Sequence, residues 1–498
     1  MSQSHWVTRL PSTRFRPYLF KNIMFLHKKT RFSIIILAIA LGFFACKAPQ
    51  LPTAASLRPM PETFAAADTS NVADVVWRDF FGDPSLNALI EEALQNNPDV
   101  QIAAARIRMA NAELTATRGA LRPFASGVVA PSLRKFGYYT MDGAGNATTD
   151  IEPGRLIPEH LPDVFVGLQS SWEMDVFRKL RNQKKAAMLR FLASQEGRNL
   201  VQTNLVAEIA LGYFDLLTLD NQLVVLQEAI QLQQQALDIV RIQKEAGKAN
   251  ELAVKQFEAQ VLNSQAQISE TQQAVVETEN LLNFLLGRFA QPIARYASFL
   301  EKALPKTSAG FPPQLLKNRP DIRQAELELA AAQADVAAAR AAFLPTISLT
   351  GSLGMQAFNP ALLIDPQSLA YGLFGGLMQP LFNKTAIEAN YQNATAGQRE
   401  LFFNYQKAAL TGTVEVSNEL ARLENLQTMF DLKTREAATL AQAIEISNDL
   451  FRLGRADYLE LLTAQQNLLT ARLELLNIKN GQFVAAVNLY KALGGGWK

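Results

Sequence analysis

Apolar residues recur every seven positions along two long stretches of the chain. Between about residues 179 and 246, where there is no proline, one position of the repeat is held by Leu216, Leu223, Ile230 and Leu237, and a second by Leu219, Leu226 and Val240. A later stretch repeats the pattern with Val416, Leu423, Phe430, Ile444 and Phe451, accompanied by Leu426 and Leu440. This repeat predicts a coiled-coil seam. A helix of about 65 residues would be roughly 100 Å long, far more than a compact domain requires.

Each long helix is predicted to fold back on itself as a helical hairpin. Gly247 and Gly454 interrupt the two apolar repeats, and glycine readily takes the left-handed conformation that ends a helix. Asn250 and Asp457 follow three residues later, and both are residue types that cap the start of a helix. The predicted hairpins span about residues 179–287 and 383–493, and their return helices end at Gly287 and Gly494.

Strict alternation of apolar and polar residues replaces the seven-residue repeat after Pro345. One face of this segment carries Ile347, Leu349, Gly351, Leu353 and Met355, and the other carries Thr346, Ser348, Thr350, Ser352 and Gln356. Such alternation is typical of a membrane β-strand with one face to lipid and one to a lumen. We predict four strands, at about residues 124–139, 163–173, 345–358 and 369–380. For any one of them, a half-buried strand of a soluble sheet is the alternative.

Four strands are too few to close a barrel, and open sheet edges are not tolerated in lipid. Several copies of the chain must therefore pool their strands. Barrels contain eight or more strands, so two copies would form a narrow, plugged barrel and three copies would supply twelve strands. The residue pattern alone does not choose between these two assemblies.

The chain also contains an internal two-fold sequence repeat. Pro98 and Pro320 each open an alanine-rich helical run that ends at Pro123 or Pro345, so that 123 − 98 and 345 − 320 both equal 25. Later landmarks keep nearly constant offsets, among them Glu208 with Glu415 and Gly287 with Gly494. Landmarks that keep their spacing indicate a duplication. We place the first repeat at residues 76–290, an inter-repeat segment at 291–317 and the second repeat at 318–498.

The N-terminal region is predicted to be a secretion signal followed by a lipid anchor. A basic flank precedes the apolar run from Phe32 to Ala45, which is too short for a stable membrane anchor, so residues 1–45 are interpreted as a signal peptide. Met24 begins a compact version of the same signal and is an alternative start. Cys46 follows the apolar run directly, as in a bacterial lipobox, although Phe43 stands where leucine is usual. Acylation of Cys46 would leave residues 46–75, rich in Ala, Pro and Thr, as a lipid-anchored tether; a processed free thiol is the alternative.

Composition argues against several classes of function. The 48 basic and 46 acidic residues give a net charge of +2, which offers no nucleic-acid surface. One cysteine and three histidines leave no basis for a Cys/His metal site, and we interpret His160 as a solvated loop residue. Lys248 follows Gly247 without the upstream glycine of a phosphate-binding loop, and no Gly-x-Ser-x-Gly motif occurs. We therefore expect neither an enzyme nor a bound cofactor.

Several motifs together resemble the TolC-like outer-membrane factors, and in particular their NodT-type lipoprotein branch. They are Ser171-Trp172-Glu173-Met174-Asp175-Val176-Phe177, Asn318-Arg319-Pro320-Asp321-Ile322, Ala339-Arg340-Ala341-Ala342-Phe343-Leu344-Pro345 and Leu453-Gly454-Arg455-Ala456-Asp457-Tyr458. The resemblance implies an α+β membrane protein: a homotrimer with a twelve-stranded transmembrane β-barrel, four strands per chain, continued by a long α-helical periplasmic tunnel. It also implies an equatorial girdle that includes residues 291–317, a place in the outer membrane, and docking to a periplasmic adaptor and an inner-membrane pump.

The same resemblance suggests two functional regions. Acidic side chains narrow the periplasmic entrance in this family, and alignment on Gly454 places Glu460 at one such position and Thr463 at another, with Asp457 nearby but out of register. The hairpin tips, with Gly247 and Lys248 in one and Gly454 and Arg455 in the other, would face the adaptor. The alternative interpretations are a solvated glutamate on a helix surface, a helix cap at Asp457, and turn chemistry alone for the tip glycines.

The expected function is thus an outer-membrane efflux channel. A non-conducting coiled-coil scaffold or adhesin lipoprotein is the alternative, because heptads and a lipid anchor would serve it too. That alternative leaves the strands between the long helices without a role.

Overall fold

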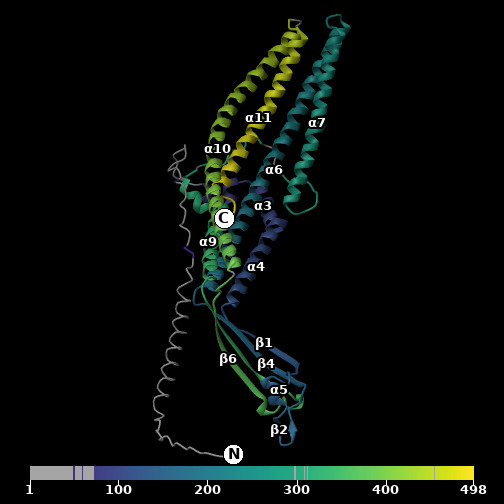
Figure 1. Ribbon diagram of the computed structural model, residues 1–498. Helices are drawn as coiled ribbons and strands as arrows, with labels where there is room; N and C mark the ends of the chain where they lie inside the picture. Colours follow the sequence, from purple (N-terminus) through teal and green to yellow (C-terminus); the bar gives the residue numbers. More distant parts are fainter. Residues whose placement is uncertain are drawn as a thin grey trace, which may run out of the picture.

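The computed structural model describes residues 49–50, 59, 72–295, 299–307, 309–310, 312–382, 384–453 and 455–498. The predicted signal peptide, the acylation site at Cys46, most of the tether and Gly454 lie outside the described residues. The described chain has strands at one end and a long helical body that ends in two hairpin tips at the other (Figure 1).

The elements alternate between helices and strands in both halves of the chain. In the first half they are η1 (Val72–Asp74), α2 (Trp77–Phe81), α3 (Pro84–Asn96), α4 (Pro98–Gly119), β1 (Phe124–Arg134), α5 (Met141–Asn146), β2 (Asp150–Glu152), β3 (Arg155–Leu156), β4 (Leu161–Met174), α6 (Lys179–Glu245) and α7 (Glu251–Leu285). In the second half they are η2 (Pro312–Gln314), α8 (Leu315–Asn318), α9 (Pro320–Ala341), β5 (Thr346–Ala357), η3 (Pro360–Leu362), η4 (Pro366–Ser368), β6 (Leu369–Met378), α10 (Thr385–Arg452) and α11 (Tyr458–Ala492).

Four long strands form one antiparallel sheet in the order β1-β4-β5-β6. They lie at the four predicted positions, with one clear difference. β1 ends at Arg134 rather than near residue 139, because Arg134 pairs with Leu161, the first residue of β4, and the described residues offer no partner strand beyond that pair. The loop between β1 and β4 also contains a short helix, α5, and a small hairpin of β2 and β3, which the sequence analysis did not predict.

The two long helical hairpins are nearly equal in length. Helices α6 and α10 contain 67 and 68 residues, and their return helices α7 and α11 contain 35 residues each. Among the described helices only α6 is long and apolar enough to cross a membrane, but half of its most apolar window is buried inside the fold, as in the core helix of a soluble protein. The hairpins run side by side away from the sheet (Figure 1).

A hydrophobic core at mid-height joins the two halves. The ring of Phe214 on α6 stacks on Phe483 of α11 with centroids 4.3 Å apart, and Phe299 of the inter-repeat segment lies 5.5 Å from Phe483. Near the N-terminus, Phe80 of α2 stacks on Tyr490 of α11 at 4.1 Å. Aromatic stacking of this kind adds roughly 0.5–1.5 kcal/mol per pair to the gain from burial. The core therefore fixes α2 and the C-terminal helix α11 to the middle of α6.

In each half of the chain, the residue before a helix-opening proline holds the end of the return helix by a hydrogen bond. Asn97 donates from its side-chain amide to the carbonyl of Leu285 at the end of α7 (2.8 Å) and also caps α4 by accepting from the N–H of Asp99. Arg319 donates to the carbonyl of Ala492 at the end of α11 (2.8 Å). The end of each return helix is thus held by the start of the helix that leads to the sheet.

Two glycines after the return helices make this closure possible. Gly287 and Gly494 have φ of 70° and 93°, a left-handed conformation that L side chains rarely adopt. A Cβ on Gly287 would lie 2.7 Å from the carbonyl oxygen of Asn96, and one on Gly494 would lie 2.5 Å from the carbonyl carbon of Asn318. Both glycines therefore allow two backbone segments to lie in close contact, in addition to forming the turn.

A paired glycine in the sheet generates a first prediction. A Cβ on Gly167 of β4 would lie 2.5 Å from the Cα of Gly354 on β5 and 2.9 Å from the ring of Phe165. We expect Gly167→Ala to disturb the pairing of β4 with β5 and to lower the stability of the folded protein by about 1–3 kcal/mol. The yield of folded protein, recognised by a gel mobility that changes on heating, should fall. Gly127→Ala on β1 is the matched control, since a Cβ there meets no atom within 4 Å. Equal yields of the two variants would contradict this view of the sheet.

Candidate functional site: the channel wall and the hairpin tips

The two faces of the sheet differ in chemistry. Strand register places one set of side chains together: Val129 and Leu133 of β1, Val164, Val166, Leu168 and Trp172 of β4, Ile347, Leu349, Leu353 and Met355 of β5, and Leu369, Tyr371, Leu373 and Leu377 of β6. The opposite face carries mostly polar or small residues: Ser126 and Ser132, Asp163, Gln169, Ser171 and Glu173, Thr346, Ser348, Thr350, Ser352 and Gln356, and Gly372 and Gly376.

The apolar face is open in the single chain. Val129 and Leu373, at the middle of the two outer strands, each leave 72% of their surface exposed. On the polar face, by contrast, Gln356 donates to the carboxylate of Asp163 at 2.7 Å. Exposing contiguous apolar surface to water costs about 25 cal/mol per Å². The sheet therefore has one face suited to lipid and one suited to water.

A layer of helices continues the sheet in the same lateral order. Helix α4 leads into β1, β4 leads into α6, α9 leads into β5, and β6 leads into α10. The helices contact one another in the order α4, α6, α9, α10, which repeats the strand order β1, β4, β5, β6. Sheet and helices thus form one continuous wall, whose far part consists of α6, α7, α10 and α11 (Figure 1).

The three entrance candidates share one exposed face of α11. Asp457, Glu460 and Thr463 are spaced by three residues and are all exposed. The same face continues through exposed Asn467 and Thr470. Residues three and four apart line one side of a helix, so this is a polar stripe along α11.

Asp457 does not cap α11 in the way that the sequence suggested. It stands at the N-cap position with extended backbone, but its side chain makes no capping hydrogen bond. Its backbone carbonyl accepts from the N–H of Glu460 at 3.2 Å instead. Asn250, its counterpart in the first hairpin, does cap α7 by accepting from the N–H of Ala253 at 2.9 Å. The carboxylate of Asp457 is therefore available to solvent.

The first hairpin tip is an exposed turn closed by backbone bonds. Gly247 has φ of 73°, a Cβ added to it would meet no atom within 4 Å, and the N–H of Lys248 donates to the carbonyl of Gln243 at 2.8 Å. Lys244 pairs with Glu251 across the turn, and this hydrogen bond holds the pKa of the Glu251 carboxyl below its ordinary value. In the second tip the N–H of Arg455 donates to the carbonyl of Leu450 at 2.8 Å. Lys248 and Arg455 are both exposed.

An ion-paired hollow lies between α10 and α11 beside the polar stripe. Its volume is about 510 Å³, and Asn467 and Thr470 of the stripe line it together with Lys433, Glu436 and Glu474. The ammonium of Lys433 lies 2.8 Å from Glu436 and 2.6 Å from Glu474. Both carboxylates contribute to raising the pKa of Lys433. The ion pairs join the two helices of the second hairpin on this face.

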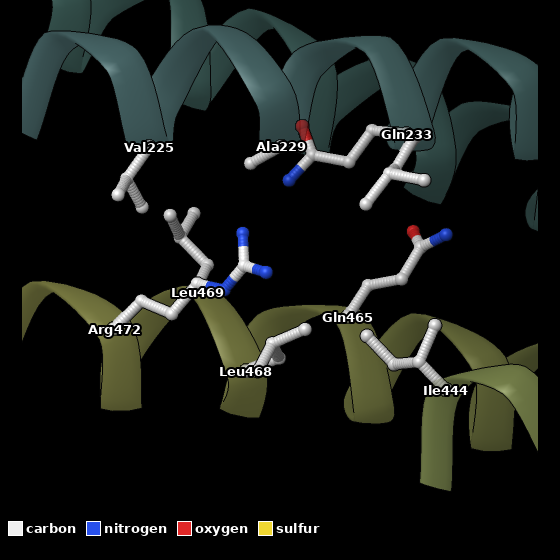
Figure 2. A pocket seen from close by; sticks show the side chains of 9 residues that line it. Val225, Ala229, Gln233, Ile444, Gln465, Leu468, Leu469 and Arg472 are labelled. Atoms are coloured by element: carbon white, nitrogen blue, oxygen red, sulfur yellow. The ribbon is translucent and has the colours of Figure 1, made fainter. Parts of the chain in front are cut away.

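Two buried glutamines face each other where the hairpins meet (Figure 2). Gln233 of α6 and Gln465 of α11 line a cavity of about 20 Å³ whose other walls are mostly apolar, including Val225, Ile444 and Leu468. Both side-chain polar atoms of Gln233, and the amide oxygen of Gln465, have no hydrogen-bond partner among the described residues. The buried glutamine pair makes this seam less stable than an all-apolar seam. Each unsatisfied polar group lowers the stability by about 1–3 kcal/mol.

Gln233 could have been found in the sequence, since it occupies the heptad position held by Leu226 and Val240 on either side of it. The contacts of Arg319 with Glu415 and Ala492 could not, because those two residues lie 96 and 173 positions away along the chain. Within the described residues no group of three or more His, Cys, Asp or Glu side chains is placed to hold a metal ion.

A sheet with one apolar and one polar face that continues into a long layer of helices is the wall expected of a membrane channel. The family model for outer membrane efflux proteins matches residues 142–288 and 311–495. The chain belongs to the outer membrane efflux protein family, and it acts in efflux at the outer membrane.

Individual relatives agree over nearly the whole chain. It is 30% identical over 468 residues to the cation efflux system protein CusC of Escherichia coli O6:H1, covering 92% of this chain and 98% of that protein. It is 29% identical over 448 residues to the probable outer membrane lipoprotein SilC of Salmonella typhimurium, covering 88% and 93%. A crystal structure of CusC, from work on its folding and transmembrane channel formation, superimposes with a TM-score of 0.78 at 28% identity, covering 90% of this chain and 99% of that one.

The glutamine pair generates a second prediction. We expect the double substitution Gln233→Leu with Gln465→Leu to remove the unsatisfied groups and to stabilise the seam by about 1 kcal/mol or more. The apparent melting temperature of the helical signal in detergent should rise by about 1 °C for each kcal/mol gained in a chain of this size. Gln227→Leu, at an exposed position of α6, is the control and should leave it unchanged. A melting temperature lower than that of the unsubstituted protein would contradict this account of the seam.

Proposed function

We propose that three copies of the chain close their sheets into a twelve-stranded β-barrel, and that their helices form a tunnel that conducts small molecules or ions out of the cell. The observation that carries the proposal is the sheet itself, which has an apolar and a polar face. Among the described residues, β1 and β6 each have one paired and one unpaired edge. In lipid, every edge must be paired.

The polar face favours three copies over two. An eight-stranded barrel has an interior that side chains fill. Much of the polar face here is lined by serine, threonine and glycine, such as Ser348, Ser352 and Gly376, which are too small to fill it. Twelve strands would leave a water-filled lumen lined by these residues.

The orientation follows from the position of the sheet. The barrel would lie in the outer membrane, with the helical body in the periplasm, and acylation of Cys46 would add a lipid anchor. The exposed residues Gly247, Lys248 and Arg455 at the hairpin tips would meet a periplasmic adaptor protein, together with Gly454, which lies outside the described residues. The adaptor would connect the tunnel to an inner-membrane pump. The chain would be a passive duct without catalytic activity.

The polar stripe on α11 would form the narrow part of the entrance. Three copies of Glu460 around the tunnel axis would repel one another and attract cations. Asp457 would add a second ring of carboxylates, because its side chain is not used as a helix cap. Thr463 would line the next level of the same face.

The internal repeat would make the wall nearly symmetric. The contact of Asn97 with Leu285 has its counterpart in the contact of Arg319 with Ala492. Such a match supports duplication of a strand-and-hairpin unit, with two units in each copy and six around the proposed tunnel.

Paired cysteines test the assembly. We expect Val129→Cys on β1 to form a disulfide with a cysteine on β6 of a neighbouring copy, because the two outer strands would pair there. The register between copies is found by scanning Leu369, Tyr371, Leu373 and Leu377, which share the outward face with Val129. At least one pair should give a product of three times the chain mass on a denaturing gel without reductant. A product that stops at twice the chain mass would point to two copies, and each single-cysteine variant is a control.

Conductance tests the entrance. We expect the purified mature protein to give small currents in planar bilayers that divalent cations reduce from the tunnel side. Glu460→Ala should raise the current and weaken this block, because one ring of charge is removed. Glu270→Ala, at an exposed position of α7, should change neither. Currents that do not respond to Glu460→Ala would exclude that residue from the constriction.

A further inference from the structure

A second hollow lies in the wall close to the sheet, and arginines line it. Its volume is about 520 Å³, and all four helices of the layer contribute to it. The lining includes Arg106 of α4, Arg190 and Arg198 of α6, Gln324 and Glu328 of α9, and Leu401 of α10. This volume is large enough for a small organic ligand.

The charge in the hollow is only partly compensated. Arg190 is ion-paired with Asp335 of α9. Glu328, the one carboxylate in the lining, accepts a hydrogen bond from Gln324 at 2.9 Å. Arg106 and Arg198 form no ion pair with a carboxylate in the described part of the chain. Two guanidinium groups are therefore free to bind a ligand, against one carboxylate.

Small residues create the space between the arginines. Gly197 and Ala193 of α6 and Ala103 of α4 line the hollow. A Cβ on Gly197 would lie 3.3 Å from the amide oxygen of Gln324, so this glycine lets α9 approach α6 closely. The hollow is thus bounded by closely packed helices, and long cationic side chains reach into it from two of them.

The basic character belongs to this part of α6 as a whole. Its first twenty residues carry six cationic side chains and one carboxylate: Lys179, Arg181, Lys184, Lys185, Arg190, Arg198 and Glu196. The N-terminus of a helix disfavours cations because of the helix dipole. Lys179, Arg181 and Arg190 form ion pairs with Glu173, Asp175 and Asp335, so within the described part of the chain the uncompensated charge is that of Lys184, Lys185 and Arg198.

All four helices of the layer share the hollow. It touches α4 and α10, the outermost helices of the layer, together with α6 and α9 between them. A hollow bounded by both outermost helices lies on the side toward which the layer curves. In the proposed trimer, that side faces the tunnel lumen.

We propose that this hollow is an anion subsite of the tunnel, which binds the carboxylate or phosphate groups of small polyvalent anions in transit. The proposal rests on the proposed trimeric duct. Arg106 and Arg198 supply planar guanidinium forks that match oxyanions in geometry as well as charge. Binding in a conduit must be weak enough for release, and Glu328 limits the affinity by its opposite charge. Three copies would place three such subsites around the lumen.

The test uses currents of the full-length mature protein in planar bilayers, with inorganic phosphate and citrate as probes. In the unsubstituted protein we expect saturable block by citrate, with weaker block by phosphate. Arg106→Glu combined with Arg198→Glu should raise the half-blocking concentration of citrate about tenfold or more, equivalent to about 1.4 kcal/mol. It should also shift the reversal potential in a KCl gradient toward cation selectivity.

The matched control changes the same charge elsewhere. Arg108→Glu combined with Arg118→Glu alters two exposed arginines of α4 that do not line the hollow, and it should leave citrate block unchanged. Equal block in the hollow variant and the unsubstituted protein, or an equal shift in the control, would overturn the subsite while leaving the duct intact. If the reversed charges prevent assembly, Arg106→Gln with Arg198→Gln provides the same comparison. Absence of any current from the unsubstituted protein would instead overturn the proposed duct.

Discussion

A peptide group inside a membrane has no water to bond with, and this constraint shapes the rest of the chain. In the proposed barrel the sheet satisfies it along three strand pairs and, among the described residues, leaves it unsatisfied along the outer edges of β1 and β6. Each edge would then be half of a contact that another copy completes. Because every strand of the sheet is continuous with one helix of the layer, joining the edges of the sheets would also bring the outermost helices α4 and α10 of neighbouring copies together. Closure of the sheet would thus determine how the helices assemble.

Along the helical body, one set of helices gives way to another at mid-height. The position of this change is set by backbone contacts as well as by side-chain packing. On the sheet side the layer consists of α4, α6, α9 and α10; on the other side α7 and α11 replace α4 and α9. The exchange is possible because Gly287 and Gly494 let the end of each return helix lie directly against the backbone that precedes α4 or α9. Any larger residue would separate these segments, and the bonds of Asn97 and Arg319 would be lost. Arg319 is itself nearly buried; burial alone would lower its pKa, but Asp321 and Glu415 raise it above the ordinary value.

Much of this architecture could be predicted from the sequence, because the long elements carry strong periodic signals. Seven-residue apolar repeats located the hairpins, and alternation located the strands within a few residues. The end of β1 could not be predicted, since it depends on the start of its partner β4. The short elements α5, β2 and β3 are too brief for a periodic signal. The predicted helix cap at Asp457 was wrong because the backbone carbonyl makes the first bond of α11 while the side chain stays free. The arginine hollow was missed for a different reason: Arg106, Arg198 and Glu328 are remote in sequence and meet only when three helices pack.

Because the two hairpins are nearly equal in length, they set a fixed distance between the sheet and the tips. Helices α6 and α10 differ by one residue in length and α7 and α11 not at all, so both tips end at nearly the same height above the sheet. Lengthening one helix alone would shift its apolar repeat out of register with that of the neighbouring helix. Lengthening one hairpin alone would leave three of the proposed six tips unable to reach the docking partner. The reach of the tunnel can therefore change only in whole heptads inserted in all four helices at once, about 10 Å at a time. A cell envelope of a different depth would require this coordinated change. The lengths of the four helices therefore determine the distance between the outer membrane and the docking partner.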